Sequence, residues 1–266
     1  MDSGSFQASR YAPERLRTHH LSVLCAQGVS AWAVHDLDRG EVIALGWGPE
    51  QQALMDPMLP KHPASVSFIS LPEWSTLVPE GALAPGTEAA HLALVHGGRP
   101  SGAMRDEPVR SLGATCIYVH DDVAERAVLE RFPNARALPM QGLMIHSVLG
   151  RAHERPTVLL HRSADRLDVA IASKGTVLMS NTFPARTAQD LLYFALLAVE
   201  QTGLHTHDAL VLVSGTHLVE GERNLLQRYF TDLAPAMRPL DPGLDTGTDF
   251  AADRWLALLE QFACVS

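Results

Sequence analysis

One short segment of this 266-residue chain has the residue order of a known catalytic motif. The segment LDTGT (residues 244–248) contains the Asp-Thr-Gly of an aspartic protease or of a displaced phosphate loop. Both kinds of site need an apolar strand in front of the motif, and Pro242 and Gly243 interrupt that stretch. We therefore expect a loop in which Asp249 caps the last helix, and no catalytic residue there.

Histidines and cysteines supply the candidate metal ligands. His205 and His207 have the spacing of two zinc ligands, but no third ligand is near in the sequence. Cys25, Cys116 and Cys264 are far apart, lie among apolar residues and form no Cys-x-x-Cys pair. We expect no metal site and no disulfide, with all three thiols reduced.

The strongest candidate for a ligand-binding loop is Ser214-Gly215-Thr216. It follows the continuous apolar run 209–213, which is typical of a strand covered on both faces. Open sheets bind ligands at the carboxyl ends of such strands, although a glycine there also serves an ordinary turn. If the chain binds a cofactor at all, the expected residues are Ser214, Gly215 and Thr216, but the sequence as a whole predicts none.

The composition excludes several classes of partner. Hydrophobic residues make up 46% of the chain, charged residues 19%, and the formal net charge is -9. An acidic chain without a basic run is a poor nucleic-acid partner. No apolar run approaches the roughly 20 residues that span a bilayer, and residues 1–18 carry no apolar signal segment. We expect a cytoplasmic protein that does not insert into membranes.

Two stretches of the chain repeat each other. Residues 23–48 and 158–183 align without a gap at an offset of 135, and each predicts a set of short strands joined by turns. The aligned identities are Val23 with Val158, Leu24 with Leu159, Val34 with Val169, Gly40 with Gly175, and Val42 with Val177. Alternating helices and strands follow each copy, which favours mixed sheets with helices on their faces. We expect a flexible arm at 1–18, a first half at 19–154 and a second half at 155–266.

Two helices of the second half carry clear patterns. Thr187 and Asp190 form a capping box before a helix that is apolar nearly all round, so we expect it to be buried on more than one side and to lie against the cleft between the halves. Residues 250–263 predict one closing helix, and residues 236–240 a short strand.

A duplicated half of this plan resembles the actin-like ATPase superfamily. The segment SNTFPARTAQDLLYFALLAVEQTGLHTHDALVLVSG (residues 180–215), together with TLVPEGAL (residues 76–83), also resembles a bacterial family known only as domain of unknown function 3822. The resemblance runs from about residue 18 to 240. It implies an α/β fold of duplicated actin-like ATPase (ribonuclease H-like) halves, each a mixed five-stranded sheet with helices on its faces. It implies no established activity.

The resemblance also shows which residues active members would need. Their first hairpin in each half holds a phosphate through a loop of the pattern Asp-x-Gly-x-(Gly/Thr). The matching loops here read CAQGVS (residues 25–30) and LHRSADR (residues 160–166). Ala26 and His161 stand where the aspartates would position magnesium, and Gly28 is the one glycine that remains. We therefore expect neither magnesium nor ATP hydrolysis.

Three functions remain open at this point. The leading hypothesis is a non-catalytic pseudo-ATPase that acts through contacts with another protein. The alternative is a protein that binds a nucleotide or small molecule in the cleft between the halves without hydrolysing it. The third is a true ATPase with a rearranged metal site, which the missing aspartates disfavour.

Overall fold

The structure is a computed structural model that describes residues 3–98, 101–237, 240, 244 and 251–265. It contains two compact units. The first unit comprises residues 1–142, 239–250 and 257–266, and the second comprises residues 143–238 and 251–256. This division follows contacts, whereas the halves expected at 19–154 and 155–266 follow the repeat, so those boundaries stay a prediction. Within the described residues no helix is long and apolar enough to cross a membrane.

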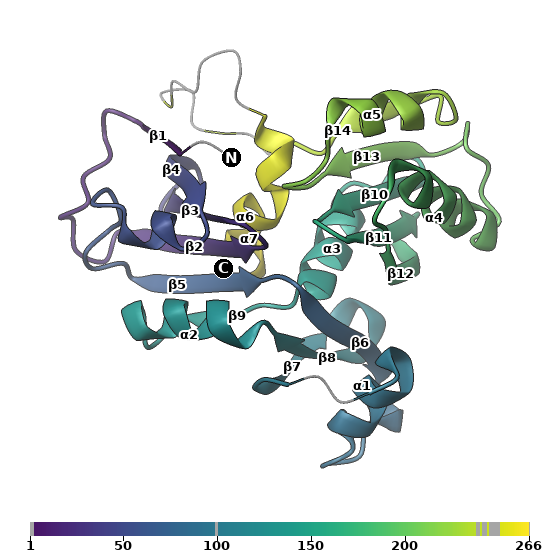
Figure 1. Ribbon diagram of the computed structural model, residues 1–266, viewed down its shortest axis with the longest axis horizontal. Helices are drawn as coiled ribbons and strands as arrows, with labels where there is room; N and C mark the ends of the chain where they lie inside the picture. The colour runs from purple at the N-terminus through teal and green to yellow at the C-terminus, as the bar shows by residue number, and fades with distance from the viewer. Residues whose placement is uncertain (1–2, 99–100, 238–239, 241–243, 245–250, 266) are drawn as a thin grey trace. The chain divides into compact units, whose positions relative to one another are not determined.

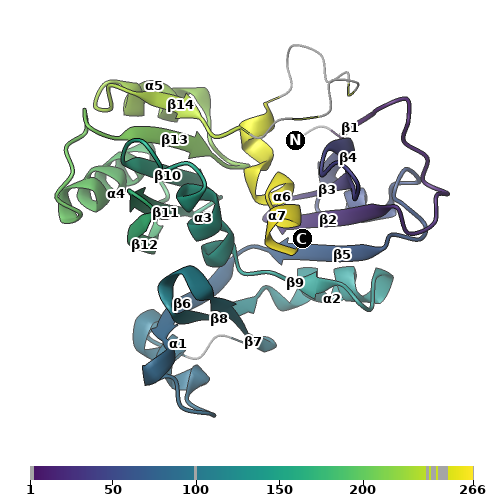
Figure 2. The same ribbon diagram turned by 180° about the vertical axis from the view of Figure 1, so that it is seen from behind.

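The first unit is built on a six-stranded sheet (Figure 1). Its strands, in the order β1-β4-β3-β2-β5-β9, are β1 (Gly4–Gln7), β2 (His19–Ala26), β3 (Val29–Asp36), β4 (Val42–Pro49), β5 (Ser65–Ser70) and β9 (Arg136–Ala137). Both β2 and β5 contact the helices α2 (Asp122–Arg131) and α7 (Gln261–Val265). Figures 1 and 2 show α2 and α7 on opposite sides of these strands. Within the expected N-terminal arm, β1 pairs antiparallel with β4.

A small second sheet completes the first unit. Its order is β6-β8-β7, with β6 (Glu73–Pro79), β7 (Met104–Val109) and β8 (Ala114–His120), and α1 (Glu88–His96) packs on it. Its core is Val78, Leu92, Ile117 and Val119. Pro79 lies in β6 and Pro108 lies in β7. Both are edge strands, where a proline is tolerated because its missing N–H faces away from the ladder.

The second unit holds a five-stranded sheet. Its strands, in the order β12-β11-β10-β13-β14, are β10 (Thr157–Arg162), β11 (Arg166–Ser173), β12 (Thr176–Pro184), β13 (Leu210–Ser214) and β14 (Leu233–Pro235). The helices α4 (Ala188–Gln201) and α5 (Glu220–Gln227) share an apolar core with this sheet. Helix α3 (Met140–Leu149) enters the second unit at Leu143.

The two larger sheets share one plan. The orders β4-β3-β2-β5-β9 and β12-β11-β10-β13-β14 match strand for strand, with three antiparallel strands followed by two parallel ones. Both carry a register shift at the same place, between Val34 and His35 in β3 and between Ile171 and Ala172 in β11. The shared bulge fixes which residues correspond.

The register corrects the gapless alignment. Aligned on the bulge, Val34 corresponds to Ile171, an offset of 137, and their partners in β2 and β10 correspond at the same offset. The strands β4 and β12 return to an offset of 135, because the second turn is shorter in the second unit. That turn is Lys174-Gly175, both at positive φ, and it joins paired residues Ser173 and Thr176. Val23 and Val158 are therefore not structural equivalents.

Three further expectations are corrected. Helix α4 begins with the predicted capping box of Thr187 and Asp190 but buries one face only, and its Tyr193 is 60% exposed. The closing helix is broken into η4 (Ala252–Trp255), α6 (Leu256–Leu259) and α7. At the second break the Gln261 side chain donates to the backbone oxygens of Ala257 and Val23, which competes with continuous helix. The strand expected at 236–240 is β14, which ends at Pro235.

Candidate functional site

The first candidate region is the turn between β2 and β3, here called the first tip (residues 25–30). Gly28 has φ +74°, which gives the turn its positive dihedral angle. A hollow of ≈ 400 Å³ lies beside it, and its lining includes Cys25, Glu50 and Asp121. Asp121 caps α2 by accepting from the N–H groups of residues 123 and 124. Two carboxyl groups and no basic side chain line this hollow, so it repels a phosphate.

Cys25 is a poor nucleophile in that position. It is buried, and burial together with the nearby Asp121 raises the pKa of its thiol to about 12. The thiolate is the reactive form of cysteine, and at neutral pH almost none of it is present at such a pKa. The first tip therefore offers neither a phosphate grip nor a covalent catalyst.

The second candidate region is the turn between β10 and β11, here called the second tip (residues 160–166). The guanidinium of Arg162 fills its interior and is buried. It donates to the backbone oxygens of Ser163, Ala164 (3.1 Å) and Arg166 (3.5 Å) and to that of Ala185 (2.7 Å). Its Nε donates to Glu222 Oε1 at 3.2 Å. Carbonyl oxygens thus converge on a cation where a phosphate loop would point N–H groups at an anion.

A buried polar row crosses the sheet beside the second tip. Thr182, Asp168, His161 and Ser214 are paired neighbours on β12, β11, β10 and β13. The Thr182 hydroxyl donates to Asp168 Oδ1 at 2.7 Å, and His161 Nδ1 lies 3.7 Å from Asp168 Oδ2. Burial by itself raises the pKa of Asp168, but Arg166, His161 and Thr182 together lower it below its ordinary value. The polar row therefore holds Asp168 as an ionised carboxylate inside the sheet.

The loop expected to hold any cofactor is packed against the second tip. Ser214 and Thr216 are buried, and Ser214 Oγ donates to the backbone oxygen of Leu160 at 3.4 Å. Gly215 has φ +131°, and a Cβ built there falls 2.1 Å from the Arg162 backbone oxygen. The glycine is thus required by close approach of two backbone segments. Thr216 Oγ1 shares a hydrogen bond with His217 Nδ1 at 3.0 Å.

The structure also corrects which residues occupy the two aspartate positions. In the bulge-based register Ala26 corresponds to Ser163, and His161 corresponds to Leu24. The positions first compared therefore differ by two residues along the strand. None of the four residues is a carboxylate.

The weaker sequence motifs do not come together into a site. His205 and His207 stack on each other with ring centroids 5.5 Å apart, and no group of three metal-binding side chains exists among the described residues. The Asp-Thr-Gly segment at 245–247 lies outside the described residues.

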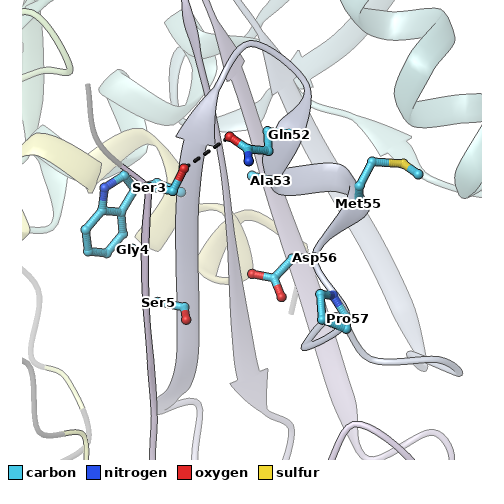
Figure 3. A pocket seen from close by; sticks show the side chains of 9 residues that line it. Ser3, Gly4, Ser5, Gln52, Ala53, Met55, Asp56 and Pro57 are labelled. Carbon is cyan, nitrogen blue, oxygen red and sulfur yellow. Dashed lines mark hydrogen bonds between the residues drawn. The ribbon is translucent and has the colours of Figure 1, made fainter.

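A hollow that the sequence did not indicate lies beside β1 and η1 (Gln52–Met55) (Figure 3). Its volume is ≈ 390 Å³, and its lining contains no basic residue. Asp56 on its wall accepts from Trp32 Nε1 (3.2 Å) and from the N–H of Met58 (2.8 Å), and Ser3 bonds Gln52 across it. Its carboxylate already has partners within the fold, so the hollow offers apolar contact, chiefly with the exposed Met55, and little charge.

Comparison with solved structures identifies the fold. A protein from Bacteroides thetaiotaomicron with an actin-like ATPase fold and unknown function is 14% identical, with a TM-score of 0.70 over 82% of this chain and 90% of that one. The PilM–PilN type IV pilus biogenesis complex contains a chain that is 11% identical, with a TM-score of 0.51 over 94% of this chain and 99% of that one. These likenesses show the actin-like fold. No curated protein sequence matches the chain.

A family model provides the assignment. It matches residues 65–233, which is more than half of the chain and runs from β5 to the first residue of β14. Strands β2 to β4 precede the matched range, although the resemblance in the sequence extends to about residue 18. The chain belongs to the family described as Protein of unknown function (DUF3822), and its fold is actin-like.

Proposed function

We propose that this protein is a non-catalytic member of the actin-like fold that acts through contacts with another protein, and that it is cytoplasmic. One observation carries the proposal, namely the Arg162 guanidinium inside the second tip. It donates to four backbone oxygens and to Glu222. A phosphate would need N–H donors in that space, and this tip offers it oxygens instead.

Displacing the guanidinium is costly. Arg162 and Glu222 are both buried, with side chains 6% and 7% exposed. Removing one partner of a buried ion pair costs about 3–5 kcal/mol, because the other charge is left without compensation. A nucleotide would have to supply that free energy before it gained any contact at the tip, and no carboxylate at Ala26 or Ser163 would hold its magnesium.

A use in protein contacts has support from the comparisons. One similar structure is a complex, that of PilM with PilN, so a protein of this fold binds a protein partner. The likeness is one of fold alone, and it supports the class of function without naming a partner for this chain.

The alternative is a protein that binds a nucleotide or small molecule without hydrolysis. The observation that favours it is the ≈ 400 Å³ hollow at the first tip, where Gly28 leaves the backbone accessible. The carboxyl groups of Glu50 and Asp121 on its wall make a neutral or cationic ligand the fitting one.

Thermal denaturation with ATP, ADP and GTP, each with and without magnesium, tests the leading proposal, and the same measurement with neutral adenosine tests the alternative. A ligand that binds only the folded protein raises its Tm, by mass action. We expect no rise and no phosphate release above background. A rise in Tm that disappears in Thr216→Val and persists in Thr206→Val, a threonine of another loop, would replace the leading proposal with nucleotide binding at the second tip.

A further inference from the structure

The first unit has a hollow of ≈ 600 Å³ with basic residues in its lining, here called the basic hollow. Three of its lining residues are Arg17, Arg131 and Arg136, and none is acidic. It lies at the amino ends of β2, β5 and β9, since His20, Ser65 and Arg136 lie at or next to the starts of those strands. In a chain whose formal net charge is -9, this is a local reversal of sign.

Two of the three arginines have no acidic partner within the described part of the chain. Arg136 pairs with Glu107. Arg17 and Arg131 form no ion pair with any described residue. On the same helix as Arg131, Arg126 does have a partner, the carboxylate of Asp122 at 3.8 Å. Along α2, the arginine outside the hollow is therefore paired and the one that lines the hollow is not.

The second unit shows what the equivalent place looks like when it is neutralised. Leu212 pairs with Ala234 as Ser67 pairs with Arg136, so Asp232 corresponds to Asn134. Asp232 Oδ2 accepts from Arg155 at 2.5 Å, and Arg155 lies just before β10, where the offset of 137 gives Thr18, the chain neighbour of Arg17, as its counterpart. The second unit thus supplies its own carboxylate, and the first unit has an uncharged amide at that position.

A structural role accounts for part of this arrangement only. Arg131 is in the last turn of α2, where a cation interacts favourably with the helix dipole. Arg17 is on no helix, and its φ of +54° is unfavourable for a residue with a side chain. Backbone strain of this kind clusters at binding sites. The dipole therefore explains Arg131 but neither Arg17 nor the absent carboxylate.

The rest of the lining sets the kind of anion that fits. The floor is His20, whose ring nitrogens bond Ser65 Oγ (2.8 Å) and Ser67 Oγ (2.9 Å), and burial lowers its pKa to about 4. The floor is therefore neutral at physiological pH. Phe132 and Val265 are among the apolar wall residues. The carboxyl end of α2 brings partial negative charge, which disfavours a compact dianion and suits separate carboxylates at separate arginines.

We propose that the basic hollow binds an acidic peptide segment of a partner protein, with an apolar side chain against Phe132 and carboxylates at Arg17 and Arg131. These carboxylates take in the first unit the place that Asp232 takes in the second. The partner's being a protein rests on the proposed function, whereas the anion site rests on the arginines alone.

Fluorescence anisotropy with a labelled peptide Asp-Glu-Phe-Asp-Glu tests the proposal, with Asn-Gln-Phe-Asn-Gln as its uncharged match. We expect the acidic peptide to bind, the uncharged one not to bind, and added salt to weaken binding. Arg131→Gln should weaken it about tenfold, since a charge-assisted hydrogen bond is lost, while Arg126→Gln on the same helix leaves it unchanged. Asn134→Asp removes no arginine, yet it should cause a similar loss by supplying an internal carboxylate.

Near-ultraviolet circular dichroism confirms that each variant is folded. Equal affinity of wild type, Arg131→Gln and Asn134→Asp for the peptide, or no binding by any of them, overturns the proposal. Inorganic phosphate is the second probe. If it binds to wild type while the acidic peptide does not, the occupant is a phosphorylated small molecule, which also overturns the peptide assignment. Neither result depends on whether nucleotides bind, so failure here is distinguishable from failure of the proposed function.

Discussion

The two larger sheets have the same strand order and the same bulge, yet their charged ends differ. In the second unit the arginines of the sheet ends pair internally, as in Arg162 with Glu222 and Arg155 with Asp232. In the first unit Arg17 and Arg131 have no such partner among the described residues, and the first tip carries the carboxyl groups of Glu50 and Asp121. The same strand order therefore carries different charges at the sheet ends of the two units.

The two units also differ in how much open space lies beside their charged groups. The second tip fills its own interior, so its loops are fixed by many internal hydrogen bonds. The first tip and the basic hollow leave space of ≈ 400 and ≈ 600 Å³ beside charged groups. Under the two proposals above, the second unit is the structural support and the first unit is the one that binds. Substitutions at matched positions test this contrast.

The largest effect is expected at Gly215. A Cβ there falls 2.1 Å from the Arg162 backbone oxygen and 2.5 Å from its nitrogen, and φ is +131°. Because backbone atoms cannot move aside as a flexible side chain can, Gly215→Ala should cost more than about 4 kcal/mol in chemical denaturation. Gly221→Ala is the matched control. Gly221 is in α5 with nothing within 4 Å, so alanine there should gain up to about 1 kcal/mol. Similar results for both variants would show that the loop is not tightly packed.

The next largest effect concerns the cation inside the second tip. Arg162→Met leaves Glu222 buried without its ion-pair partner, so we expect a loss of about 3–5 kcal/mol in the free energy of unfolding. Adding Glu222→Gln should restore part of that loss, because the uncompensated charge is then removed. A double variant no more stable than Arg162→Met would mean that the bonds to backbone oxygens dominate.

Particular residues show how much of the fold could be predicted from the sequence. Local signals predicted local structure, since the capping box of Thr187 and Asp190 does begin α4. The mixed sheets and the actin-like fold are likewise confirmed. The register failed because Gly40 and Gly175 look alike in sequence but lie in turns of different length. Turn length is a property of the folded pairing, and a glycine alone does not reveal it.

The candidate sites were harder to predict. Ser214, Gly215 and Thr216 were singled out by their place after a strand, but Gly215 is required by contact with the Arg162 backbone, from a strand 53 positions earlier. The sequence did not predict the basic hollow, because its arginines, Arg17, Arg131 and Arg136, are scattered along the chain. One signal was present, namely an uncharged Asn134 at the place where the second unit has Asp232. It became readable only after the strand register was known.

As the pH is lowered, the first unit should begin to lose stability at a higher pH than the titration of its carboxylates alone would cause. Burial lowers the pKa of His20 to about 4, so the unfolded chain binds more protons between about pH 6.5 and pH 4. Stability due to this group is full above pH 6.5 and falls by up to about 3 kcal/mol as the pH drops to 4. His20→Gln should flatten that part of the curve in urea denaturation. Measurement at pH 8 isolates any loss of packing, and an unchanged slope would exclude His20 as the cause.

The second unit has its counterpart in Asp168. Its folded-state pKa is lowered, so the stability it contributes is present above the unfolded pKa of about 3.9 and is lost as the pH falls through the folded value. Asp168→Asn should cost about 1–3 kcal/mol at pH 7, and the difference from wild type should shrink below about pH 4. Asp165→Asn removes an exposed carboxylate of the turn just before β11 and should change stability by less than about 0.5 kcal/mol.

The smallest effect tests the comparison most directly, because it exchanges one residue between the two sheet ends. The side chains of Arg155 and Asp232 are 43% and 45% exposed, so their ion pair is worth at most about 1 kcal/mol. Asp232→Asn should cost about that much, and Asn134→Asp should gain a similar amount by giving the arginines of the basic hollow a carboxylate. High salt should remove both changes, since exposed pairs are screened. Urea denaturation measures the free energy of unfolding of Asp232→Asn, of Asn134→Asp and of the double variant. The double variant should be about as stable as wild type. If Asn134→Asp and Asp232→Asn both destabilise the protein, a carboxylate at position 134 is unfavourable. The sheet ends of the two units would then not be equivalent in charge.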